Sequence, residues 1–79
     1  MSDIEQQICA FLADEAGLDS IDPGESLVES GLIDSAEVLN LVAFLEETFD
    51  LELDPADITL RNFDSVRQMA ALVRQAQEG

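Results

Sequence analysis

Histidine and lysine are missing from this sequence of 79 residues, and cysteine occurs only once, as Cys9. Without histidine or lysine, the serines and the cysteine lack the bases that usually activate a nucleophile, and the commonest metal ligand is absent. A single cysteine also excludes an intramolecular disulfide and a cysteine-based zinc site. We therefore interpret Cys9 as a small apolar residue of a helix and expect that the protein is not an enzyme.

Basic residues are scarce, because three arginines stand against eighteen aspartates and glutamates and leave a formal charge of −15. Such a surface repels nucleic acids and anionic lipids and attracts basic protein surfaces. We therefore expect protein partners, and neither nucleic acid nor membrane. The arginines Arg61, Arg67 and Arg74 are expected only to form surface ion pairs, each worth about 0–1 kcal/mol.

Long apolar runs are also absent: no stretch approaches the roughly 20 residues of a membrane span, and the N-terminus has no signal-peptide pattern. Hydrophobic residues nevertheless make up 47% of the chain and recur at helical spacing, which favours a folded core over disorder. We expect one domain over residues 1–79, in a cytoplasmic and monomeric protein. Its small core is expected to supply no more than about 3–5 kcal/mol.

Two longer helices are predicted in the first half of the chain. The first begins with a capping box at residues 2–5, which includes Ser2, and ends at Gly17. Its core face contains Ile4, Ile8, Phe11 and Leu12. The second runs from about Ser35 to Phe49, with a core face formed by Val38, Leu41, Val42, Leu45 and Phe49.

The second half predicts a short helical turn and a last helix. Asp54 followed by Pro55 indicates an N-cap and the first helical position of the short turn. A capping box at residues 65–68 starts the last helix, which continues to about Gln77 on Val66, Met69, Ala70, Val73 and Ala76. Ile58, Leu60 and Phe63 are expected to anchor the segment between them. No strand pattern competes, so we predict an all-α fold, a small bundle of three main helices and one short helix.

The segment between the first two helices, residues 17–34, is long for a connection without regular structure. Its apolar residues are expected to hold it against the core: Leu18, Ile21, Leu27, Leu32 and Ile33. It ends at Asp34 and Ser35, where a helix N-terminus with unpaired N–H groups favours a phosphate. The alternative is that this Asp-Ser pair is only a helix cap.

A second apolar strip lies on the predicted helix 35–49, beside its core face. Ala36, Leu39 and Ala43 form it, and Asn40, Glu46 and Glu47 flank it. Apolar residues ringed by carboxylates suit a transient protein contact. The alternative is that Leu39 packs under the long loop.

Alternating carboxylates at residues 50–54 call for a comparison with calcium-binding loops. The sixth position of an EF-hand loop that began at Asp50 would be Pro55 instead of glycine, and the twelfth would be Arg61 instead of glutamate. We therefore predict no metal site.

Three segments of the chain resemble the acyl carrier protein and peptidyl carrier protein family: Gly-Leu-Ile-Asp-Ser-Ala-Glu-Val-Leu at 31–39, Phe-Leu-Glu-Glu-Thr-Phe at 44–49 and Asn-Phe-Asp-Ser-Val at 62–66. The resemblance implies a helical bundle of acyl-carrier-protein type in which Ser35, preceded by Asp34, bears 4′-phosphopantetheine through a phosphodiester. The thiol of that arm would carry an acyl or aminoacyl group as a thioester. The resemblance also implies that helix 35–49, with Glu37, Glu46 and Glu47, docks onto basic patches of modifying and client enzymes.

Two details refine the resemblance. Ala36 stands where the family usually has leucine or methionine, a side chain that typically contacts the phosphopantetheinyl transferase. Leu32 and Ile33 separate Gly31 from Asp34, a spacing similar to that of D-alanyl carrier proteins and standalone peptidyl carriers. It favours an aminoacyl or small acyl cargo, received from a loading ligase or acyltransferase. The alternative function is a non-modified acidic helical interaction module, which has no need of Ser35.

Overall fold

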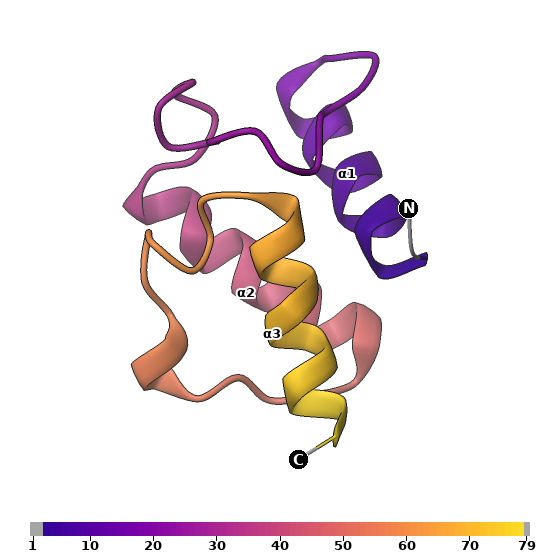
Figure 1. The fold of residues 1–79 in the computed structure, drawn as a ribbon, viewed down its shortest axis with the longest axis vertical. Helices are drawn as coiled ribbons and strands as arrows, with labels where there is room; N and C mark the ends of the chain where they lie inside the picture. The colour runs from indigo at the N-terminus through magenta and orange to yellow at the C-terminus, as the bar shows by residue number, and fades with distance from the viewer. Residues whose placement is uncertain (1–2, 79) are drawn as a thin grey trace.

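The computed structural model describes residues 3–78, which form three α-helices and one 3-10 helix (Figure 1). These are α1 (Asp3–Ala16), α2 (Ser35–Phe49), η1 (Pro55–Asp57) and α3 (Val66–Glu78). No strand occurs within the described range. The predicted all-α bundle of three main helices and one short one is therefore confirmed. The predicted cap at Ser2 lies outside the described residues.

The ends of α1 and α2 follow from local backbone chemistry. Gly17 adopts a φ of +70°, which glycine does readily, and the Leu18 N–H donates to the Ala13 carbonyl at 2.8 Å. At the end of α2, Asp50 takes the left-handed conformation with a φ of 52°, and its N–H donates to the Glu46 carbonyl. Aspartate is one of the few residues besides glycine that tolerate this conformation. The predicted bounds of α2 are confirmed.

The start of α3 is capped from two sides. The Ser65 hydroxyl oxygen accepts the Gln68 N–H at 3.2 Å, and the hydroxyl in turn donates to the Gln68 side chain at 3.2 Å. The predicted pairing of these residues is confirmed, although Gln68 reaches the hydroxyl and not the Ser65 backbone N–H. The Arg67 N–H donates to the Pro23 carbonyl at 3.0 Å. The long loop thus satisfies a helix donor that α3 itself leaves unpaired.

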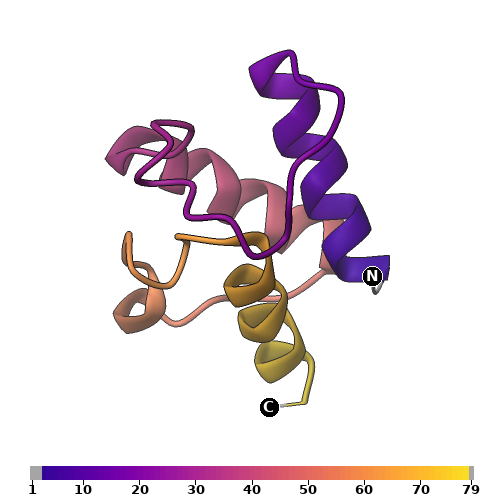
Figure 2. The same ribbon diagram turned by 45° about the horizontal axis from the view of Figure 1, so that its top comes forward.

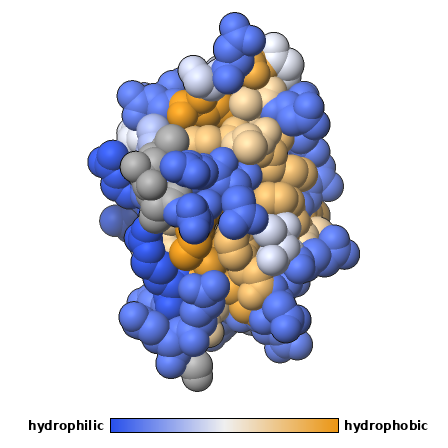
Figure 3. All heavy atoms as spheres, turned by 90° about the vertical axis from the view of Figure 1, so that its right-hand side faces the viewer, coloured by the Kyte–Doolittle hydropathy of each residue, from blue (hydrophilic) through white to orange (hydrophobic). Residues whose placement is uncertain are grey.

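The core draws on all three α-helices and on the loops between them. The helices α1 and α3 pack against each other, and Figures 1 and 2 show the segment after α1 crossing to the start of α2. The largest fully buried side chains are Phe63, Ile8, Leu27, Leu41, Leu45, Met69, Val66 and Val73. The rings of Phe11 and Phe44 stack with their centroids 4.1 Å apart and join α1 to α2. Figure 3, which faces the α1 side, shows a continuous band of apolar side chains bordered by hydrophilic ones.

The long loop is held to the core by fewer residues than predicted. Ile21, Leu27 and Ile33 are buried and Leu32 is half-buried, as expected. Leu18 is 45% exposed, so its predicted packing is wrong, because it follows the glycine turn that directs the chain away from α1. Leu60, predicted as an anchor, is 39% exposed, so this prediction is also wrong.

Cys9, Arg67 and Arg74 have the structural roles expected of them. The buried Cys9 thiol donates to the Ile21 carbonyl at 3.4 Å, and burial raises its pKa, with further contributions from Glu5 and Asp22. Arg67 and Arg74 both lie near the Glu5 carboxylate, at 4.0 and 3.8 Å. Because both arginines are solvent-exposed, these ion pairs contribute at most about 1 kcal/mol.

Candidate functional site

The turn that leads into α2 is held by hydrogen bonds to one carbonyl group. The Leu27 carbonyl accepts hydrogen bonds from the N–H groups of Leu32 and Ile33, at 2.9 and 3.2 Å, and from the Ser30 hydroxyl at 3.1 Å. Gly31 completes the turn with a φ of +82°, a conformation that favours glycine. Because Leu27 and Ile33 are buried, the turn fixes the position at which Asp34 and Ser35 follow.

Asp64 ties this turn to the start of α3. Its Oδ1 accepts the Ser26 hydroxyl at 2.7 Å and the Val28 N–H at 3.1 Å, and its backbone carbonyl accepts the Leu27 N–H at 2.6 Å. This role was not predicted from the sequence. The only signal was the position of Asp64 immediately before the predicted cap of α3.

Asp34 and Ser35 have different positions and roles at the N-terminus of α2. Asp34 is the N-cap, with φ −130° and ψ −172°, and its Oδ1 accepts the Glu37 N–H at 2.9 Å. Ser35 is the first helical residue and is exposed. Within residues 3–78 its hydroxyl makes no hydrogen bond. The capping interpretation therefore applies to Asp34, and the Ser35 hydroxyl lies at the surface.

The surroundings of Ser35 fit a phosphodiester. The N–H groups of Ser35 and Ala36 belong to the first turn, where a helix supplies no internal acceptors and its dipole favours an anion. The negative charge of the Asp34 carboxylate repels a phosphate, but one of the carboxylate oxygens accepts the Glu37 N–H. An anion attached to the Ser35 oxygen would therefore lie next to backbone N–H donors.

An open depression of about 200 Å³ begins at Ser35. Val38 and Leu39 of α2 line one side, and Ile58, Thr59 and Leu60 from the segment after η1 line the other. Leu39 is 67% exposed, so the alternative in which it packs under the long loop is wrong. The place of Ile58 and Leu60 beside Ser35 was missed, because both were taken only as core anchors.

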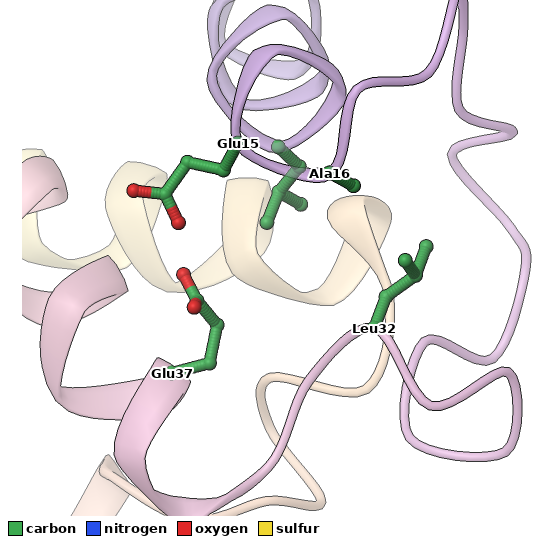
Figure 4. A pocket seen from close by; sticks show the side chains of 5 residues that line it. Glu15, Ala16, Leu32 and Glu37 are labelled. Carbon is green, nitrogen blue, oxygen red and sulfur yellow. The ribbon is translucent and has the colours of Figure 1, made fainter.

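The predicted partner strip is only partly formed as expected. Ala36, Leu39, Asn40, Ala43 and Glu47 are all exposed on α2. Two of the acids expected to take part in docking, Glu37 and Glu46, are instead half-buried. The Glu46 carboxylate accepts the Leu53 N–H at 3.0 Å, and the Glu37 side chain is turned toward α1 (Figure 4).

Neither a cluster of metal ligands nor a membrane-spanning helix occurs among the described residues. Among residues 3–78, no three histidine, cysteine, aspartate or glutamate side chains are grouped so that they could hold a metal ion. None of the helices in this part of the chain has both the length and the hydrophobicity that crossing a bilayer requires.

Comparison with known proteins identifies the family. A family model described as phosphopantetheine attachment site matches residues 6–73. A D-alanyl carrier protein of Lactobacillus delbrueckii subsp. bulgaricus is 29% identical over 77 residues, which cover 96% of each chain. One of Lactococcus lactis subsp. lactis is 26% identical over 77 residues, which cover 95% of this chain and 98% of the relative. The chain therefore belongs to the phosphopantetheine attachment site family, the carrier proteins that bear covalently attached 4′-phosphopantetheine.

Proposed function

We propose that Ser35 is the attachment point of 4′-phosphopantetheine and that the protein carries an aminoacyl or small acyl group between partner enzymes. The observation that supports this most directly is the exposed Ser35 hydroxyl at the first position of α2, beside the Asp34 cap. The family match includes this segment, since it covers residues 6–73. The same match speaks against the alternative of a non-modified acidic module.

The arm supplies a thiol, which holds the cargo as a thioester, and the chain supplies the anchor and its surroundings. The oxygen of Ser35 forms the phosphodiester, and the first-turn N–H groups of α2 stabilise its negative charge. Since the sequence has neither histidine nor lysine, the base that activates the Ser35 hydroxyl comes from the transferase. The protein acts as a tethered substrate for other enzymes.

The nature of the cargo is suggested by the relatives and by the loop. Two relatives that match over nearly their whole length are named D-alanyl carrier proteins. The spacing between Gly31 and Asp34 favours the same group of carriers. A D-alanyl group is therefore the first cargo to test, ahead of a fatty acyl chain.

The partners would be a phosphopantetheinyl transferase and a ligase that loads the cargo, each with a basic docking patch. Their contact surface is the predicted strip of α2 and its polar neighbours, of which Glu37 and Glu46 are half-buried and the rest exposed: Ala36, Glu37, Leu39, Asn40, Ala43, Glu46 and Glu47. The charge of −15 supports attraction to such patches. A monomeric state and a cytoplasmic location stay predictions.

Attachment at Ser35 is tested by incubating the protein with coenzyme A and a broad-specificity phosphopantetheinyl transferase, followed by intact-mass measurement. We expect the wild-type protein to gain one phosphopantetheine, the Ser35→Ala variant to gain none, and peptide mapping to place the group on Ser35. Ser20→Ala is the matched control, because Ser20 is an exposed loop serine. If Ser35→Ala is modified at the wild-type rate, or wild type is never modified beside a carrier that is, the assignment fails.

The cargo is tested on the modified protein with purified ligases and ATP. A D-alanine-activating ligase should add a D-alanyl group that hydroxylamine releases, as expected for a thioester. Efficient charging by a fatty-acid ligase, with none by the D-alanine enzyme, would overturn the aminoacyl proposal and leave the attachment at Ser35 intact.

A further inference from the structure

Two glutamate side chains from different helices face each other across the contact between α1 and α2. Glu15 lies in the last turn of α1 and Glu37 in the first turn of α2, and Figure 4 shows their carboxyl groups pointing toward one another. Together with Leu12, Ala16 and Leu32 they line a cavity of about 80 Å³. Glu37 is half-buried and Glu15 is exposed. The apolar side chains beside them reduce the hydration that would offset two negative charges at close range.

The hydrogen bonding around Glu37 is incomplete in its ionised form. Its Oε1 is buried and has no hydrogen-bond partner in the part of the chain that the structure describes. Asn40, one turn on, favours the ionised form and lowers the pKa of Glu37. Because an ionised carboxylate can only accept hydrogen bonds, Glu15 and Glu37 cannot bond to each other unless one of them holds a proton.

Within residues 3–78, no cation contributes to the pKa shift of Glu37. The charged groups that act on Glu37 are Glu15 from α1 and Asp34 from the start of its own helix, and both are acidic. The loop contributes the apolar Leu32 to the cavity. Arg67 and Arg74, on α3, lie instead at Glu5 in the first turns of α1.

We propose that Glu15 and Glu37 share one proton and thereby form a pH-dependent latch between the end of α1 and the first turn of α2. With the proton present, the carboxyl of one residue donates to the other and closes the contact. When the proton leaves, two carboxylates face each other across the cavity and repel, and the contact loosens. Because the first turn of α2 begins at Ser35, the latch links pH to the position of the proposed attachment point.

The titration range follows from the surroundings of Glu37. Burial, together with the hydrogen bond and charge of Glu15 and the charge of Asp34, raises its pKa from 4.5 to about 7, against a lowering contribution from Asn40. At pH values between 4.5 and about 7, the Glu37 carboxyl is protonated more often in the folded protein than in the unfolded chain. The pair therefore stabilises the fold least above about pH 7, and its contribution grows as the pH falls toward 4.5.

The latch is tested on the unmodified full chain, so the result does not depend on the proposed role of Ser35. In carboxyl-carbon NMR, the Glu37 resonance should titrate near pH 7, and Glu15→Gln should shift this midpoint to lower pH. The backbone amide signals of Glu15–Ala16 and of Ser35–Glu37 should change with the same midpoint. In thermal unfolding, the melting temperature of wild type should fall as the pH rises from about 4.5 to about 7, and then level off.

The Glu37→Gln variant imitates the protonated acid and should lose most of this fall. The control is Glu47→Gln, which removes one charge from an exposed position of the same helix and should keep the wild-type pH dependence. The proposal is overturned if both carboxyl groups titrate in the ordinary glutamate range. It is equally overturned if Glu37→Gln keeps the wild-type pH dependence, or if the amide signals do not follow the titration.

Discussion

At the scale of single residues, the structural role and the proposed chemical role at the N-terminus of α2 belong to two different residues. Asp34 completes the helix start by accepting the Glu37 N–H, which leaves the next hydroxyl at the surface. If Ser35 itself were the cap, its oxygen would be occupied by a backbone donor. An exposed serine that follows an aspartate cap can be modified without removing that cap.

Exchanging Asp34 distinguishes capping from recognition by the transferase. Asp34→Ala removes the acceptor of the Glu37 N–H and should cost about 0.5–2 kcal/mol in urea unfolding, whereas Asp34→Asn keeps a side-chain oxygen and should stay near wild type. We expect Asp34→Asn to accept phosphopantetheine more slowly, because it folds normally but has lost the charge. Wild-type stability of Asp34→Ala would contradict the capping role, and a wild-type loading rate of Asp34→Asn would contradict a recognition role.

At the scale of elements, the connection between α1 and α2 is an ordered structure supported by α3. The Asp64 side chain and carbonyl bind three groups of residues 26–28, and the Pro23 carbonyl accepts the Arg67 N–H. The loop and the start of α3 thus satisfy each other's polar groups. Because the same loop leads into Asp34, the start of α3 helps to position the start of α2.

Removing the Asp64 carboxylate should loosen this loop. Asp64→Ala leaves the Val28 N–H and the Ser26 hydroxyl without their acceptor and should cost about 1–3 kcal/mol in unfolding. Faster hydrogen exchange is expected at Leu27 and Val28. Asp64→Asn keeps the oxygen and should largely restore protection, and Asp19→Asn serves as a control at an exposed acid of the same loop. Equal exchange in Asp64→Ala and wild type would refute the anchoring role.

At the scale of the whole molecule, the sequence predicts helices better than it predicts how loops pack. The period of apolar residues locates α2 and α3, since it reports which face of a helix is buried. It does not report contacts between distant segments, such as the bond from Ser26 to Asp64, 38 residues apart. For that reason the exposure of Leu18 and Leu60 was mispredicted, and the turn of Glu37 toward Glu15 was not foreseen.

The net charge of the molecule should govern how fast its enzymes find it. With a charge of −15, phosphopantetheine loading by a transferase with a basic docking patch should slow as salt rises past about 0.1 M, where charges are screened beyond about 10 Å. Glu47→Lys, on the exposed strip of α2, should slow loading at low salt and flatten its salt dependence. Glu78→Lys changes the net charge equally but lies at the end of α3, so it should have a smaller effect. Equal slowing by both variants, measured by intact mass over time, would show that total charge acts without a preferred docking face on α2.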